Sequence, residues 1–204
     1  MIEKNPNAHL ESFSDGVFAI AITLLILEIK VPPLASMNSI AEVWNAIWHL
    51  WPSFFALILS FGMILISWIG HHNSFKLLDK TSDRFQFANG FFLFTVVIIP
   101  FPTAFVAEYL NTPYAQPAMV FYCLCSLLHN VGWRLLFRYM LKPSLVKDST
   151  SHNHLEGRAK GARYGTFIYF ALVVVAWWLP YAALILSLLL WLYWAYLSLT
   201  KKEN

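Results

Sequence analysis

The sequence predicts an all-α membrane protein with six transmembrane helices. Of its 204 residues, 58% are hydrophobic and only 12% are charged, whereas soluble domains carry about 25% charged residues. The apolar residues also gather in stretches close to the roughly 20 residues that a helix needs to cross a bilayer. The distribution of lysine and arginine along the chain then sets the orientation.

The predicted spans cover residues 13–31, 51–70, 87–109, 117–137, 164–179 and 181–199. No segment is left for a soluble domain, so residues 1–204 are expected to form one six-helix transmembrane domain. Only Leu179 and Pro180 separate the last two spans, which predicts a tight helical hairpin. The longest polar stretch, residues 142–163, is expected to be a loop. The N-terminal apolar run is too long for a cleavable signal peptide.

Basic residues lie almost entirely on one side of the predicted membrane. Lys30 falls on one side, and the other 13 of the 14 lysines and arginines fall on the opposite side. Short loops rich in lysine and arginine stay in the cytoplasm, so both termini are expected to be cytoplasmic. Trp44, Trp48 and Trp51 lie near a predicted span end, as aromatic residues at membrane interfaces do.

Several function classes find no support in the composition. The net charge of +3 is mild, and no nucleic-acid-binding pattern is present. Cys123 and Cys125 lie two apart, so on a helix they point to different faces and cannot bond to each other. No sequence signature of a catalytic nucleophile or of a metalloenzyme is present. The chain is therefore not expected to be an enzyme, and no cofactor or metal is expected.

The first span, "FSDGVFAIAITLLILEI" from residue 13, carries two polar residues that need an explanation. At 100° per residue, one face of this helix gathers Ile20, Thr23, Leu24 and Leu27. Glu28 lies beside this face at the outer end, and Asp15 lies about 140° away from Ile20. Periodicity alone does not distinguish a face in lipid from a face lining a water-repelling pore. The Thr23 hydroxyl can also bond to its own helix backbone, at residue 19.

Asp15 is the more informative residue because a carboxylate inside the membrane boundary is costly. Such residues usually face a protein interior or a water-filled cavity. Trp68 and His71 at the end of the second span, and Asn89 at the start of the third, fall at the same depth and can donate hydrogen bonds to it. The alternative is an aspartate exposed to headgroups or capping the helix. The adjacent histidines at 71 and 72 lack the four-residue spacing that suits a metal.

These residues resemble those of the transmembrane protein 175 family, which contains the endolysosomal potassium channel and its prokaryotic relatives. The resemblance lies in "FSD" at residues 13–15, "SF" at 60–61, "WIGHHNSF" at 68–75, Asn89 and "PFPT" at 100–103. The animal members carry two six-helix repeats. This chain has one repeat, which resembles the prokaryotic form and implies a homotetramer in the plasma membrane of a prokaryote.

The resemblance implies a potassium-preferring cation channel, with the lipid bilayer and three further copies of the chain as its partners. Four copies of the first helix would line a central pore. Ile20, Leu24 and Leu27 would form the apolar constriction, Thr23 the selective layer and Glu28 the pore mouth. Phe13, Ser14 and Asp15 would be buried against the next helices, in a structural network with Trp68, His71 and Asn89.

One position departs from the family, and two other functions stay open. The family commonly has an arginine four residues before the phenylalanine of "FSD", and this chain has His9. Histidine changes its charge between pH 5 and 8 when unperturbed, so His9 makes a response to cytoplasmic pH an open hypothesis. The alternative functions are a proton-coupled transporter or proton pathway through Asp15 and His71, and an intramembrane enzyme.

Overall fold

The computed structural model describes residues 7–33 and 38–200, apart from the side chains of Glu28 and of residues 198–200. Over these residues the chain is helical. The elements are α1 (Ala8–Leu24), the 3₁₀-helix η1 (Leu25–Glu28), α2 (Ile40–His49), α3 (Trp51–Phe75), α4 (Asp83–Ile98), α5 (Pro100–Tyr109), α6 (Ala115–Met140), α7 (Ser149–Trp178) and α8 (Pro180–Thr200).

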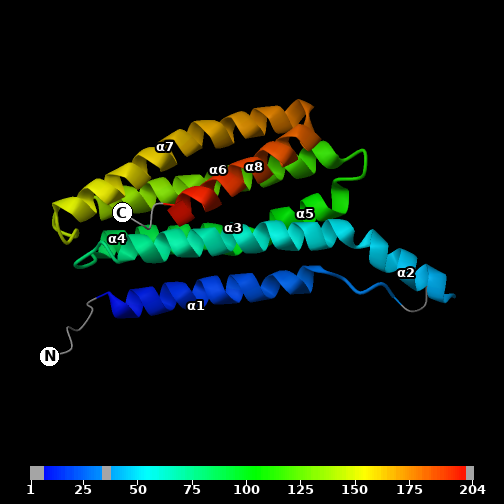
Figure 1. Cartoon of the computed structure of the whole chain (residues 1–204), viewed down its shortest axis with the longest axis horizontal. Coiled ribbons are helices and arrows are strands. Elements are labelled where there is room, and N and C mark those ends of the chain that lie inside the picture. Colours follow the sequence, from blue (N-terminus) through cyan, green and yellow to red (C-terminus); the bar gives the residue numbers. More distant parts are fainter. Residues whose placement is uncertain (1–6, 34–37, 201–204) are drawn as a thin grey trace.

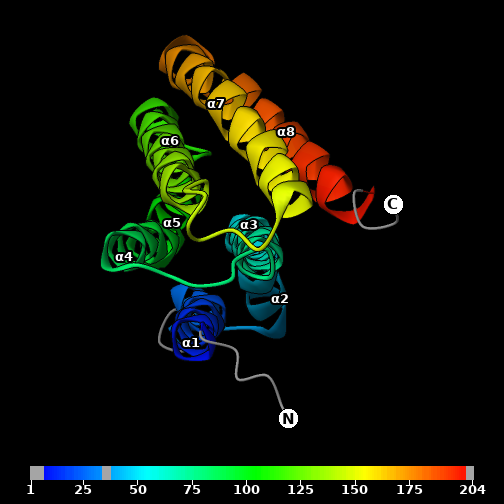
Figure 2. The same ribbon diagram turned by 90° about the vertical axis from the view of Figure 1, so that its left-hand side faces the viewer.

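The long helices run side by side, roughly along one common axis (Figure 1). The beginning of α1 and the end of α8 lie at the same end of this bundle, together with the α3–α4 and α6–α7 connections. The other end carries α2, the α5–α6 connection and the turn between α7 and α8. In the end-on view, α1 lies at one edge against α3 and α4, and α7 and α8 lie at the far edge (Figure 2).

Five helical segments in the described ranges are long and apolar enough to span a membrane. They are Ala8–Leu27, Ile40–Phe75, Asp83–Tyr109, Ala115–Met140 and Pro180–Leu197. The chain is therefore an integral membrane protein, but the count is five rather than the six expected. The expected span that is not among the five covers residues 164–179, the apolar half of α7. Arg163 directly before it and several aromatic residues within it lower the mean hydropathy of this part of the helix.

The expectation of a loop over residues 142–163 is wrong for most of that stretch, because α7 already begins at Ser149. The Asp148 side chain accepts a hydrogen bond of 2.7 Å from the Ser151 backbone N–H and caps the helix. Hydrogen bonds from Ser151 hold the pKa of Asp148 below its usual range. Leu155, Ala159 and Ala162 are buried at helical spacing, so this polar sequence carries an apolar stripe and forms the first half of α7.

Two other span boundaries differ from the prediction. The helix at 87–109 is broken at Ile99 into α4 and α5, because Pro100 has no backbone N–H and begins a new helix. The helix at 51–70 extends to Phe75, and α2 precedes it. With Leu50 between them, α2 and α3 span 36 residues, or about 54 Å of helix, which exceeds a hydrocarbon core of about 30 Å. The predicted hairpin is present, with Leu179 between α7 and α8.

Two apolar cores hold the bundle together. One joins α1, α3, α4 and α6, and includes Phe18, Ile64, Phe92 and Leu136. The other joins α5, α6, α7 and α8. At the end of the bundle where α1 begins, the α3–α4 and α6–α7 connections are tied by backbone hydrogen bonds from Asp79 N to Leu145 O (2.8 Å) and from Lys147 N to Leu77 O (3.2 Å).

Candidate functional site

The first helix has one packed face and one uncovered face. Ser14, Phe18, Ala21 and Leu25 are buried at spacings of three and four residues, which places them on one side of α1, where it packs on α3 and α4. The uncovered side carries the residues of the sequence-derived pore face. Their exposed fractions are 60% for Ile20, 50% for Leu24 and 63% for Leu27.

Thr23 lies on the same uncovered face and is exposed. Its hydroxyl donates a 3.0 Å hydrogen bond to the Ile20 carbonyl, so the bond to the helix's own backbone goes to residue 20 rather than 19. The oxygen keeps its lone pairs for a water or an ion. The α-helix ends at Leu24, so Leu27 lies in η1 and not on a continuous α-helix. The Glu28 side chain lies outside the described part of the chain.

On the packed face, three side chains from three helices form a buried chain of hydrogen bonds. The His71 Nε2 lies 2.7 Å from the Asn89 Oδ1. The Asn89 Nδ2 donates to the Ser14 Oγ at 3.0 Å, and the Ser14 hydroxyl donates to the Leu10 carbonyl at 2.8 Å. Since Ser14, His71 and Asn89 are at most 1% exposed, this chain fixes α1 against α3 and α4 through direct, buried hydrogen bonds.

Asp15 lies beside that chain of hydrogen bonds but has a different partner. Its Oδ1 accepts a 2.8 Å hydrogen bond from the Trp68 Nε1. Trp68 also stacks on His72, with ring centroids 5.7 Å apart. Among the described residues, His71 and Asn89 bond to each other and Asn89 to Ser14, so the expectation that both donate to Asp15 is wrong. The Asn89 amide therefore bridges α4 and α1 and does not pair with the half-buried Asp15 carboxylate.

Phe13 does not lie where the resemblance implied. It is 61% exposed in the single chain, because it falls on the uncovered side of α1 with Gly16 and Ile20. Packing of Phe13 within the chain is therefore excluded. His9 is also exposed, in the first turn of α1.

The His71 ring of the network is surrounded by aromatic rings. His71 stacks on Phe92 at 5.6 Å between centroids, and its ring lies 4.3 Å from Phe75 and 5.5 Å from Phe18. Over the residues that the structure describes, no group of three histidine, cysteine, aspartate or glutamate side chains could hold a metal ion. The arrangement supports a structural role, since the His71 ring is packed among aromatic rings and its Nε2 pairs with Asn89.

Sequence reasoning missed a second buried histidine site deeper in the bundle. His129 of α6 lies between two hydroxyls, with Nε2 2.9 Å from Ser67 Oγ and Nδ1 2.9 Å from Thr95 Oγ1. Thr95 donates its own proton to the Phe92 carbonyl at 2.6 Å, so its oxygen is left to accept from the His129 Nδ1–H. A lone histidine in an apolar span was the available signal, but its partners lie on helices far apart in sequence.

The family described as "Endosomal/lysosomal potassium channel TMEM175" matches residues 9–100. A protein named potassium channel from Chamaesiphon minutus is 37% identical over 181 residues, covering 87% of this chain and 89% of that protein. Another protein named potassium channel, from Streptomyces collinus, is 37% identical over 145 residues, covering 71% of this chain and 69% of that protein.

A solved structure agrees over nearly the whole chain. The crystal structure titled as a lysosomal potassium-selective channel TMEM175 homolog from Chamaesiphon minutus superposes with a TM-score of 0.84 at 33% identity, covering 94% of this chain and 97% of that chain. The similarity therefore includes α6 to α8, beyond the residues that the family match covers.

Proposed function

The chain belongs to the TMEM175 family, and from this premise we propose that it is a potassium-preferring cation channel that conducts passively. Relatives named potassium channel that match most of this chain support the proposal. These relatives are bacterial, and the chain is an integral protein of a prokaryotic plasma membrane. Both termini lie on its cytoplasmic side in the proposed orientation, in keeping with the basic residues at that end of the bundle.

The observation that carries the proposal is the uncovered face of α1. It carries three large exposed apolar residues, Ile20, Leu24 and Leu27, and the exposed hydroxyl of Thr23. The helix α1 itself lies at one edge of the bundle (Figure 2). Four copies of the chain arranged around this face as a homotetramer would line a central pore with it. Phe13 on the same side of α1 would then be covered by a neighbouring copy, which accounts for its exposure in the single chain.

In such a pore the apolar residues and the threonine have separate roles. Rings of Ile20, Leu24 and Leu27 narrow the path and repel water, as apolar constrictions do in other channels. Four Thr23 hydroxyls between the rings of Ile20 and Leu27 offer oxygen atoms to a partly dehydrated ion. Potassium loses its hydration shell more readily than sodium, so weak oxygen ligands favour it. Glu28 at the outer end would concentrate cations at the mouth.

The network of Ser14, Asp15, Trp68, His71 and Asn89 would orient α1 without touching the ion. It lies on the packed side of α1, opposite the stripe of Ile20, Thr23 and Leu27. Its hydrogen bonds connect α1 to α3 and α4 near the proposed cytoplasmic end. A fixed helix is needed because four copies of the same side chain must meet at one level to form a constriction.

Flux through the purified protein in liposomes tests the proposal. Single-channel steps that reverse near the potassium equilibrium potential are expected when potassium is the main permeant ion. Uphill movement of potassium driven by a proton gradient would instead establish a coupled transporter and overturn passive conduction. Counting subunits in detergent by mass measurement tests the tetramer separately, and a monomer or a dimer would contradict it.

A further inference from the structure

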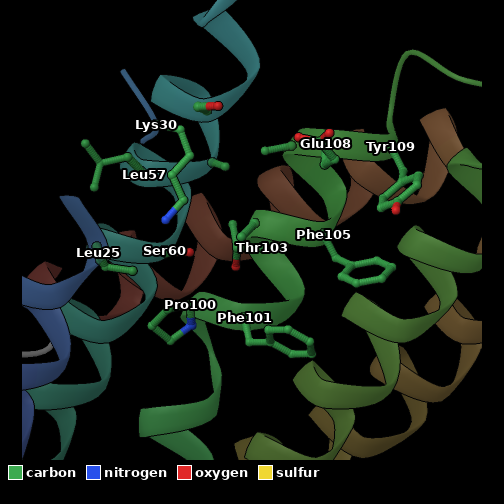
Figure 3. Close-up of a pocket in the computed structure, with 14 residues that line it drawn as sticks. Leu25, Lys30, Leu57, Ser60, Pro100, Phe101, Thr103, Phe105, Glu108 and Tyr109 are labelled. Carbon is green, nitrogen blue, oxygen red and sulfur yellow. The ribbon is translucent and has the colours of Figure 1, made fainter. Parts of the chain in front are cut away.

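A half-open cavity of about 320 Å³, which the proposed pore does not use, is lined by η1, Lys30, the first part of α3 and α5 (Figure 3). Both remaining sequence motifs of the family reach it, since "SF" contributes Ser60 and "PFPT" contributes Pro100, Phe101 and Thr103. Pro100, which begins α5 after the break at Ile99, also lines the cavity.

Ser60 brings an unsatisfied hydroxyl to this cavity. Its side chain is only 2% exposed, and its Oγ has no hydrogen-bond partner among the described residues. In protein structures, the large majority of buried side-chain polar atoms have a hydrogen-bond partner. Thr103 cannot donate to it, because the Thr103 hydroxyl donates to the Ile99 carbonyl at 2.8 Å. Ser60 is therefore a free donor that points to an acceptor from outside the chain.

Two opposite charges line the same cavity without forming an ion pair. The Lys30 side chain extends inward towards the level of Ser60, and Glu108 lies nearer the outer end (Figure 3). Lys30 donates a long hydrogen bond of 3.4 Å to the Leu27 carbonyl. In the described part of the chain, the single ion pair joins Lys160 and Glu156. Lys30 and Glu108 therefore line the same cavity without pairing with each other.

We propose that this cavity binds a zwitterion with an oxyanion and a protonated amine. The oxyanion accepts hydrogen bonds from the Lys30 ammonium and the Ser60 hydroxyl, and the amine donates to the Glu108 carboxylate. Leu25, Leu57 and Phe101 supply apolar walls for the rest of the ligand. This chemistry has two sources: the phosphoethanolamine headgroup of a membrane lipid, and a free small zwitterion such as phosphoethanolamine or an amino acid.

The cavity also lies directly behind the proposed constriction. Leu25 lines it, and the Leu27 carbonyl is the acceptor for Lys30, so a ligand that engages Lys30 acts on the η1 segment. Binding itself does not depend on the channel function, whereas an effect of the ligand on conduction rests on the proposed function. The two are separated by measuring binding on purified protein with no ion flux involved.

The test measures the thermal stability of the delipidated full chain in detergent as ligand is added. The probes are phosphatidylethanolamine, phosphatidylcholine, phosphatidylglycerol, free phosphoethanolamine and glycine. Phosphatidylcholine has no N–H donor for Glu108, and phosphatidylglycerol has no cation. Stabilisation by phosphatidylethanolamine alone assigns the lipid headgroup, and stabilisation by phosphoethanolamine or glycine assigns a free zwitterion.

Variants connect the binding to the three residues. Lys30→Gln, Glu108→Gln and Ser60→Ala are each expected to raise the half-saturating concentration about tenfold, as loss of a charge-assisted hydrogen bond does. Glu42→Gln is the control, since Glu42 is an exposed acid on α2 that does not line the cavity. If Ser60→Ala cannot be purified, Lys30→Gln and Glu108→Gln test the proposal by themselves, because both residues are exposed.

Three outcomes would overturn the proposal. The first is equal stabilisation by all the phospholipids, which indicates general lipid solvation. The second is an absence of stabilisation by every probe, which leaves the cavity to water or a neighbouring copy. The third is unchanged affinity in Lys30→Gln and Glu108→Gln. Loss of potassium flux with binding intact would count against the channel and not against this site.

Discussion

Thr23 is the residue whose chemistry bears most directly on ion selectivity. Thr23→Ala removes the hydroxyl while keeping the helix, so potassium and sodium permeabilities are expected to approach each other without loss of current. The present preference is expected to be about tenfold, or roughly 1.4 kcal/mol, because hydroxyls are weak ligands. Reversal potentials with potassium on one side and sodium on the other measure the ratio. Thr23→Ser serves as the control and should keep most of the preference.

An unchanged permeability ratio in Thr23→Ala would place the selective layer elsewhere on the pore. The hydrogen bond from Thr23 to the Ile20 carbonyl would then be the whole role of the hydroxyl.

The indole of Trp68 tests the role of Asp15. Trp68→Phe keeps an aromatic ring on His72 but removes the N–H that Asp15 accepts from. The half-buried carboxylate is left without that donor, which typically costs about 1–3 kcal/mol. The melting temperature of the assembled protein in detergent should fall, and the permeability ratio should not change. A shift in selectivity with unchanged stability would mean that Asp15 faces the ion path.

The side chains of α1 illustrate what could and could not be predicted from the sequence at the scale of residues. The stripe of Ile20, Thr23, Leu24 and Leu27 follows from helical spacing alone, and these residues are uncovered in the structure. Trp68 was among the expected donors to Asp15, and this pair is confirmed. The pairs His71–Asn89 and Asn89–Ser14 did not follow, because the depth of a residue in a membrane restricts which residues can meet but not which atoms pair. Phe13 was misplaced because its burial was taken from the family resemblance, although its helical spacing puts it on the same side of α1 as Ile20, where it is 61% exposed.

At the scale of elements, close packing between α3 and α8 rests on a glycine. A Cβ added at Gly62 would overlap the Trp191 indole. Gly62→Ala is therefore expected to destabilise the protein by about 1–3 kcal/mol through overpacking. Gly157→Ala in α7 is the control, because a Cβ there meets nothing within 4 Å, and replacing a helical glycine should stabilise slightly. Chemical denaturation or thermal melting compares the two variants.

Trp191→Leu should rescue Gly62→Ala, since a smaller side chain makes room for the added Cβ. Failure of this rescue would contradict packing against Trp191 as the cause of the instability.

Helix ends were predicted well where the length of an apolar stretch determines them. They were missed where a helix cap or a proline break determines them. The 26 residues of α6 extend the predicted span by a few residues at each end. The helix α2 was missed because its ten residues are too few to span a bilayer. Its N-terminal cap could have been recognised in the sequence, where Glu42 follows Ser39 by three residues. In the structure the Ser39 side chain accepts a hydrogen bond of 3.2 Å from the Glu42 N–H. The polar half of α7 was taken for a loop because hydropathy was weighed above the buried stripe of Leu155, Ala159 and Ala162.

At the scale of the whole molecule, leucines of similar exposure lie on different sides of the bundle. The proposed assembly predicts a different environment for each of them. Leu27 is 63% exposed on η1, and Leu189 is 55% exposed on α8. In the end-on view α1 and α8 lie at different edges of the bundle (Figure 2). If four copies meet at α1, Leu27 faces the pore and Leu189 faces lipid.

A matched pair of asparagine substitutions distinguishes these environments. Leu27→Asn should wet the constriction, raise the potassium current and weaken selectivity, because polar side chains hold water in a narrow pore. Leu189→Asn exposes an amide to lipid, which lowers stability or yield but should leave the current of each assembled channel unchanged. Single-channel recording gives the conductance, and subunit counting confirms that both variants assemble. An altered conductance in Leu189→Asn with normal conduction in Leu27→Asn would place the pore at α8 and overturn assembly around α1.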